Sequence, residues 1–113
     1  MLRVHFLKVR EDRVERLRWW MAQLNQRQEE VRQTFAQETV RHEIAYLLEA
    51  RDGPMLVYIV EANDVKQASR AYQSSTLPID LEHRQVMQDV SAGPAAVEML
   101  YECRMPEDPK IGT

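Results

Sequence analysis

The tight turn at Asp52-Gly53-Pro54 constrains the fold more than any other feature of the chain. Residues 39–51 before it alternate apolar and polar side chains, and residues 55–61 after it form a second apolar run. Both runs have the residue types of β-strands, and two strands joined by so short a turn pair as an antiparallel hairpin. We therefore expect an antiparallel sheet that contains this hairpin.

Apolar residues elsewhere follow either the strand period or the helix period. Residues 2–9 predict a strand that is apolar on both faces, and residues 95–105 predict the last strand of the sheet. The apolar side of that last strand consists of Val97, Met99, Tyr101 and Cys103.

Three helices are predicted in the intervening segments. The first is a continuous helix of roughly 24 residues that begins near Asp12 and carries an apolar stripe. Asn63 or Asp64 supplies the N-cap of the second helix, and the third helix runs over residues 81–90. The resulting order, βαββααβ, is the ferredoxin-like α+β pattern with one inserted helix.

The domain boundaries follow from length and composition. A chain of 113 residues suits a single domain with one core, which we place over residues 1–105. Residues 106–113 are mostly polar and contain two prolines, so we expect a loose C-terminal tail.

The predicted sheet carries apolar side chains on both faces. Helices cover one face of such a sheet, so the other face should be polar in a domain that works alone. Strand 39–51 instead has Ile44 and Tyr46 on one side and Ala45 and Leu47 on the other. A two-fold copy of the same chain is the commonest partner among soluble oligomers. We therefore predict a homodimer in which two sheets face each other as a dimeric α/β barrel.

Charge and cysteine content exclude several classes of protein. Fifteen Lys and Arg residues against eighteen Asp and Glu residues leave a formal net charge of −3, which does not favour nucleic acid as a partner. No run approaches the roughly 20 apolar residues of a membrane span, and the first residues lack a signal peptide pattern. Cys103 is the single cysteine, so we expect no intrachain disulfide and a reducing, cytoplasmic location.

The segment from Pro78 to His83 contains two candidate functional side chains within one helical turn. Asp80 lies at a helix start, where we favour an N-capping role, and His83 falls on the apolar side of the same helix. A buried imidazole needs a hydrogen-bond partner, for which Asp80, Glu43 and a backbone carbonyl are candidates. His83, Glu43 and Asp80 are our candidate catalytic residues, set against simpler structural roles. We predict no metal site, because a capping Asp80 has already used an oxygen.

Other candidate residues lie on the hairpin and on the first helix. Glu43 shares a strand face with apolar neighbours, where burial would raise its carboxyl pKa and suit it to act as a general base or as a partner for His83. Tyr58, on the other strand of the hairpin, is the candidate ligand-binding residue together with His83. Trp20 borders the apolar stripe of the first helix and is predicted in the core, whereas Trp19 projects beyond it.

Taken together, these motifs resemble those of a family of small, uncharacterised bacterial proteins in the dimeric α/β-barrel superfamily. They are the hairpin with Glu43, the strand with Tyr58, the Asn63-Asp64 helix start and Ser75-x-x-Pro78-Ile79-Asp80-x-x-His83. The resemblance covers most of residues 2–105 and implies ferredoxin-like protomers paired into a homodimer. The superfamily includes cofactor-independent monooxygenases, haem-degrading enzymes and muconolactone isomerase-like proteins, so the fold selects no single activity. No haem-ligand motif matches residue by residue, and the resemblance implies no cofactor.

Three functions remain open on these grounds. The first is binding of a small molecule in a pocket near Asp80, His83, Glu43 and Tyr58. The second is a cofactor-independent monooxygenase or isomerase in which His83 or Glu43 moves a proton and Tyr58 orients the substrate. The third is a protein-interaction module without catalysis, which acts through the dimer or through the helix surface around Trp19. An accessible cavity beside His83 favours the first two functions, and an exposed Trp19 without a pocket favours the third.

Overall fold

The predicted hairpin forms one half of a four-stranded antiparallel sheet. In the computed structural model, which describes residues 1–106, β2 (Val40–Ala50) and β3 (Gly53–Ala62) pair in antiparallel register. β1 (Leu2–Val9) pairs with β3, and β4 (Ser91–Pro94) pairs with β1, so the strand order is β2-β3-β1-β4. This order and the antiparallel directions are consistent with the predicted ferredoxin-like arrangement, and the fold class is α+β.

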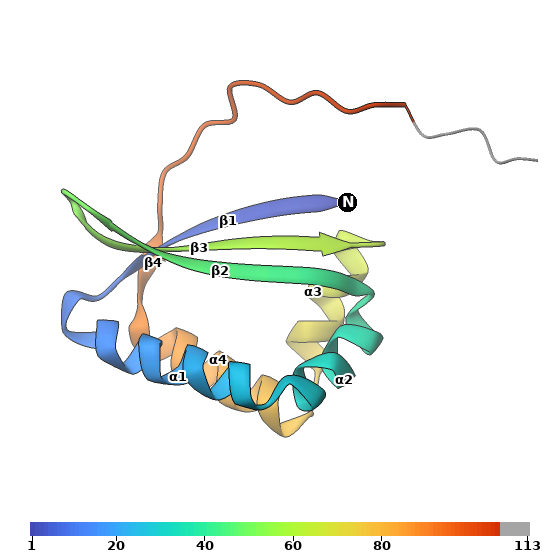
Figure 1. Ribbon diagram of the computed structural model, residues 1–113, viewed down its shortest axis with the longest axis horizontal. Helices are drawn as coiled ribbons and strands as arrows, with labels where there is room; N and C mark the ends of the chain where they lie inside the picture. Colours follow the sequence, from blue (N-terminus) through green and yellow to red (C-terminus); the bar gives the residue numbers. More distant parts are fainter. Residues whose placement is uncertain (107–113) are drawn as a thin grey trace, which may run out of the picture.

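All of the helices lie on one face of this sheet (Figure 1). A 3₁₀ turn at Glu11–Arg13 leads into α1 (Val14–Gln26), and α2 (Gln28–Glu38) follows after a single residue. The two other helices, α3 (Val65–Ser74) and α4 (Pro78–Val90), both follow the hairpin in the sequence. Asp64 caps α3 through a hydrogen bond from the Gln67 backbone N–H, as the sequence predicts.

The prediction of one continuous first helix is wrong, because the helix breaks at Arg27. The backbone there has φ −108° and ψ 39°, and the Arg27 N–H is shared between the carbonyl oxygens of Gln23 and Leu24. The Arg27 guanidinium pairs with Glu30 in the next turn and with Glu82 on α4. These contacts tie the break to α4, so that α1 packs beside α4 and α2 beside α3.

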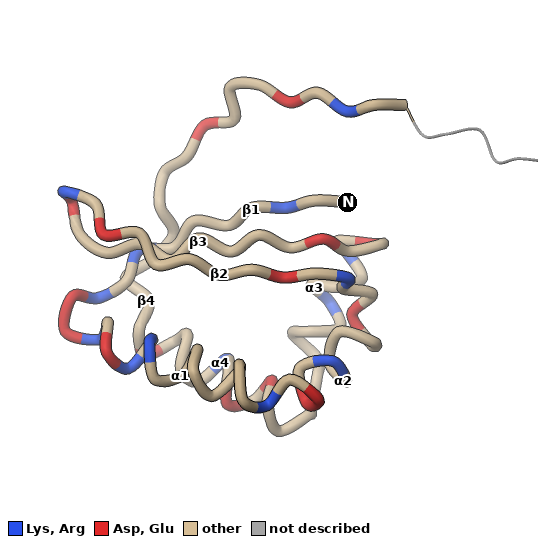
Figure 2. The backbone as a smooth tube through the Cα atoms, in the orientation of Figure 1, with Lys and Arg blue, Asp and Glu red and all other residues tan. Residues whose placement is uncertain are grey.

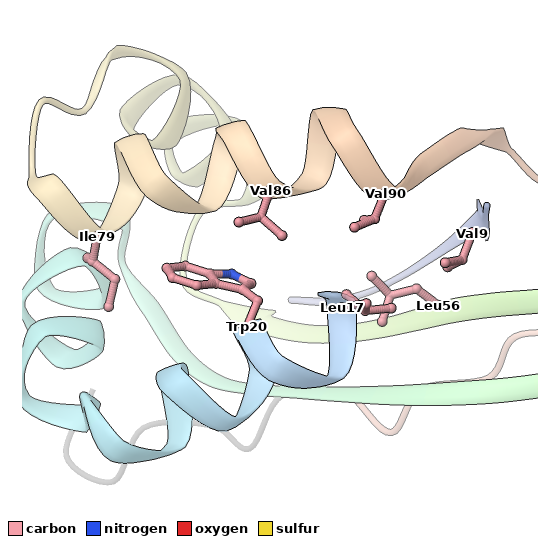
Figure 3. Close-up of a cluster of buried hydrophobic side chains, with 7 residues drawn as sticks. All are labelled: Val9, Leu17, Trp20, Leu56, Ile79, Val86 and Val90. Carbon is pink, nitrogen blue, oxygen red and sulfur yellow. The ribbon is translucent and has the colours of Figure 1, made fainter. Parts of the chain in front are cut away.

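The core lies between β1, β3, α1 and α4 (Figure 3). Trp20 is 1% exposed and inserts between α1 and α4, as predicted, whereas Trp19 is 56% exposed. Burial of one large apolar side chain of this kind contributes about 1.5–3 kcal/mol. The buried apolar cluster comprises Val9, Leu17, Trp20, Leu56, Ile79, Val86 and Val90.

The prediction for the last strand is also wrong. The strand is β4, at Ser91–Pro94, and the pairing ends where the Ala95 N–H donates to the Phe6 carbonyl oxygen. Pro94 is tolerated there because β4 is an edge strand. Residues 96–106 form no regular structure and are exposed, including Cys103, which we predicted on the apolar side of the last strand. Of the predicted loose tail at 106–113, residues 107–113 lie outside the described part of the chain.

The face of the sheet opposite the helices is apolar and uncovered within residues 1–106. The register aligns Val4, Ile59 and Ile44 in one row across this face and Phe6, Val57 and Tyr46 in the next. Exposure along the face reaches 65% at Leu2, 56% at Tyr46 and 49% at Leu48. This face, called the open face below, is the second apolar face predicted from the sequence.

Candidate functional site

A short chain of hydrogen bonds holds His83 beneath the sheet. Trp20 Nε1–H donates to His83 Nδ1 at 2.8 Å, and an indole nitrogen can only donate. The proton of the neutral imidazole is therefore on Nε2, which lies 3.4 Å from the Tyr58 hydroxyl. Burial lowers the pKa of His83 to about 4, against the raising effect of the Asp80 charge. His83 is thus neutral at pH 7 and directs an N–H toward Tyr58.

Asp80 does not cap its helix, contrary to the prediction. The N-cap of α4 is Leu77, with no side-chain hydrogen bond, and Pro78 is the first helical residue. The Asp80 carboxylate is 3% exposed and accepts hydrogen bonds from the hydroxyls of Thr34 on α2 and Ser75 before α4, both at 2.5 Å. Asp80 therefore joins α2 to the α3–α4 connection and places a buried negative charge beside the site.

Two further carboxyl groups, Glu38 and Glu43, lie near that charge. Burial raises the pKa of Glu43 to about 7, and the Asp80 charge adds to the increase. The same two causes, in the same order, raise the pKa of Glu38 to about 7. Both groups therefore exchange protons near neutral pH, which is where a general base works best. Glu38 is only 6% exposed, and its Oε2 has no hydrogen-bond partner.

These side chains line a pocket of about 380 Å³ between the sheet and α3. Glu38, Glu43, Tyr58, Tyr72 and His83 form its polar part. Its apolar walls come from Val40, Val60, Ala62, Val65, Ala68 and Met87. The exposed residues Arg3, His5 and Ser69 also belong to the lining.

The two tyrosines stay protonated in this setting. Burial raises the pKa of Tyr58 well above its usual value, and the Glu43 charge raises it further. Burial likewise raises the pKa of Tyr72. The rings of Tyr58 and Tyr72 both meet the His83 ring edge-on, with centroids 6.1 and 5.8 Å away. The pocket therefore offers hydroxyl donors beside carboxyl groups that gain or lose a proton near pH 7.

Glu43 also borders a second cavity on the other side of the site. This cavity measures about 740 Å³ and lies between α1, α2 and β2, with Tyr58 again in its lining. A smaller space of about 60 Å³ between α2 and α4 is lined by Glu38, Glu43, Asp80 and His83. The residues proposed from the sequence thus come together, with Glu43 in the lining of all three spaces.

Sequence reasoning missed Glu38 and Thr34 on α2. Glu38 continues the helical spacing of Val31 and Phe35, so its position on the inward side of the helix was readable. Thr34 has no such signal, because its role depends on the distant Asp80. The Trp20–His83 hydrogen bond likewise joins residues far apart in the sequence.

The two other histidines border the cavities and lie outside the hydrogen-bonded cluster around His83. His42 is exposed at the start of β2, and His5 lies on the lining of the pocket beside Arg3. Within residues 1–106, no three His, Cys, Asp or Glu side chains are arranged to hold a metal ion. No helix in that part of the chain has the length and apolar character to cross a membrane.

The fold and the site together define an α+β protein with a pocket, apolar on most of its lining and polar at one part, between an antiparallel sheet and its helices. Residues 2–109 match the model of a family of unknown function, DUF6176, and the chain belongs to that family. No curated protein and no solved structure matches it.

Proposed function

We propose that this protein binds a small, mostly apolar molecule in the 380 Å³ pocket, with the polar end of the ligand at Glu38, Glu43 and Tyr58. Glu38 lines this pocket, and its buried Oε2, which has no hydrogen-bond partner, is the observation that carries the proposal. Buried side-chain oxygens are almost always hydrogen-bonded, so one left free beside a cavity suits a donor supplied by a ligand. The volume lies within the range of about 300–1,000 Å³ that is usual for ligand pockets.

Charge narrows the class of ligand. Asp80, Glu38 and Glu43 lie around the same site, and each raises the cost of adding another negative charge. A hydroxyl or ammonium group can donate to the Glu38 and Glu43 oxygens, whereas a carboxylate or phosphate is repelled by them. We therefore expect an apolar body that carries a hydrogen-bond donor.

A thermal-shift comparison tests this proposal. Pairs of small molecules with the same apolar body and either an ammonium or a carboxylate group should separate, with stabilisation by the ammonium member alone. Ala68→Phe, which fills the pocket from α3, should abolish the shift. Gln67→Phe is the matched control, because Gln67 is the exposed neighbour on the same helix. An equal shift in both variants would place the ligand elsewhere.

A proton-transfer enzyme is the second candidate, and the raised pKa of Glu43 beside Tyr58 favours it. In an isomerisation, the Glu43 carboxylate would take a proton from one carbon of the substrate and return it to another. The Tyr58 hydroxyl would donate a hydrogen bond to the oxygen on which negative charge develops. His83 would position that hydroxyl, since its own Nδ1 already accepts from Trp20.

Hydrogen exchange on a bound ligand tests this second candidate. When the ligand is incubated in D₂O with wild-type protein, a ligand C–H should be replaced by C–D, which NMR detects. Glu43→Gln should stop this exchange. His83→Gln should slow the exchange and retain its dependence on a group with a pKa near 7. Binding without any exchange in the wild type would leave the protein as a binding protein.

We also propose that a second copy of the chain covers the open face. The central rows of this face contain only apolar side chains, and the charged Lys8 and Glu61 lie at its two ends. A contiguous exposed apolar surface of this kind marks a binding surface in soluble proteins. Light scattering should give twice the chain mass of 13.3 kDa at micromolar concentration. A mass of one chain would refute the dimer.

A further inference from the structure

Residues 96–105, called the C-terminal arm below, have the pattern of a strand but no partner in their own chain. The odd-numbered positions are all apolar, and three of the even-numbered ones, Glu98, Glu102 and Arg104, are charged. Such alternation is typical of a strand with one buried face. Exposure is nevertheless 61% at Val97 and 83% at Tyr101. The backbone groups of the arm form no hydrogen bond with residues 1–95.

The path of the arm leads away from its own sheet. After Ala95 the chain rises on the side of the open face and then runs alongside the sheet (Figure 1). The charged residues are spaced along this exposed stretch (Figure 2). A sheet packed face to face lies about 10 Å above the first. The arm therefore runs on the side where a second sheet, stacked on the open face, would be found.

The outer edge of β2 is the edge of the sheet to which an additional strand can pair. β2 is eleven residues long and pairs only with β3, so the N–H and C=O groups along its other edge are unpaired by the described strands. The arm of the same chain starts at the opposite edge, beyond β4, and would have to cross about 14 Å of sheet to reach it. A two-fold axis parallel to the strands, between two facing sheets, instead brings the β4 edge of one copy beside the β2 edge of the other.

We propose that the arm of each copy adds as an antiparallel strand to the β2 edge of a second copy. This proposal depends on the dimer proposed above. The direction follows from the axis, since β4 runs opposite to β2 within the sheet. This pairing directs the apolar side of the arm toward the layer that contains Ile44, Tyr46 and Leu48, and directs the charged side outward. The same pairing thus gives hydrogen-bond partners to the backbone groups of the arm and buries its apolar side.

Substitutions at two neighbouring residues on opposite sides of the arm test whether the arm is exchanged between the copies. Met99 and Leu100 are 76% and 85% exposed and differ in the side of the arm that they occupy. Met99→Glu should shift the light-scattering mass to that of one chain, whereas Leu100→Glu should leave the dimer intact. Circular dichroism should show the same secondary structure in both variants, because neither residue contacts the core. A dimer that survives Met99→Glu would overturn the arm exchange and leave the facing sheets in place, and a monomeric wild type would overturn both.

The single native cysteine provides a direct second test. An antiparallel arm brings Cys103 close to the start of the second copy's β2, where His42 lies on the open face. Under mild oxidation, His42→Cys should give a disulfide-linked dimer on a non-reducing gel. The link should be absent from Leu48→Cys, at the far end of β2, and from His42→Cys combined with Cys103→Ser. An intramolecular disulfide in His42→Cys would show that the arm folds back on its own chain and would overturn the proposal.

Discussion

Replacing Glu43 by glutamine should make stability depend less on pH. Burial raises the pKa of Glu43 to about 7 from 4.5 in the unfolded chain. The unfolded chain therefore releases this proton first, so stability falls as pH rises from about 4.5 through about 7 and then levels off. At about 1.36 kcal/mol per pKa unit, the loss is about 0.8 kcal/mol at about pH 5 and about 3.4 kcal/mol at about pH 8.5. The glutamine variant escapes this loss because its side chain does not ionise.

Urea unfolding of wild type and Glu43→Gln, at one protein concentration and at both pH values, measures the difference. The advantage of the variant should grow by about 2.5 kcal/mol between about pH 5 and about pH 8.5. Glu98→Gln, on the exposed arm, is the control for loss of a carboxylate and should change stability equally at both pH values. If the Glu43→Gln advantage is the same at both pH values, the inference that burial raises this pKa is refuted.

Three other substitutions test contacts that hold the site. Trp20→Phe should cost about 1–3 kcal/mol in urea unfolding, because it leaves a buried imidazole nitrogen without its donor, while Trp19→Phe at the exposed neighbour should cost almost nothing. Thr34→Val should cost about 1.5–3 kcal/mol, since it removes a hydrogen bond to the buried Asp80 carboxylate; an unchanged unfolding midpoint would contradict this. Asp64→Ala should cost about 1 kcal/mol through loss of the N-cap of α3, and the loss should be visible in thermal unfolding followed by circular dichroism.

The fold was largely readable from local patterns because its main elements have strong ones. The hairpin was predicted from Gly53 and Pro54 between two apolar runs. The structure turns at Arg51 and Asp52, and Gly53, the first residue of β3, adopts φ 115°, which other residues rarely reach. The Asp64 cap and the inward side of α4 also follow from a few neighbouring residues. Each of these features is decided within about ten residues of chain, so the sequence alone could predict it.

The features that the sequence did not predict depend on contacts between distant segments. No glycine or proline lies between Val14 and Glu38 to mark the break at Arg27, and the break is held by an ion pair to α4. Asp80 looks like a cap locally, yet its partners are hydroxyls on α2 and before α4. The arm reads as a strand because its alternation is real, but no edge of its own sheet receives it.

The candidate site was predicted in part for the same reason. Glu43 and Tyr58 occupy the helix side of the sheet, as strand alternation requires, and His83 faces them from α4. The network that sets the protonation of His83 could not be read from the sequence, because Trp20 supplies the decisive hydrogen bond from another helix. The helical period predicts an inward position for Glu38, but Glu38 lies at the polar end of α2, which weakens that signal.

The break at Arg27 gives the two halves of one helical segment separate tasks. The half before it, α1, contributes Leu17 and Trp20 to the core, and the half after it, α2, contributes Thr34 and Glu38 to the site. A substitution at Glu38 therefore changes the lining of the pocket without removing a side chain from the buried apolar cluster. Under the proposed function, relatives that differ in ligand preference are expected to vary along α2 and to keep the core residues of α1.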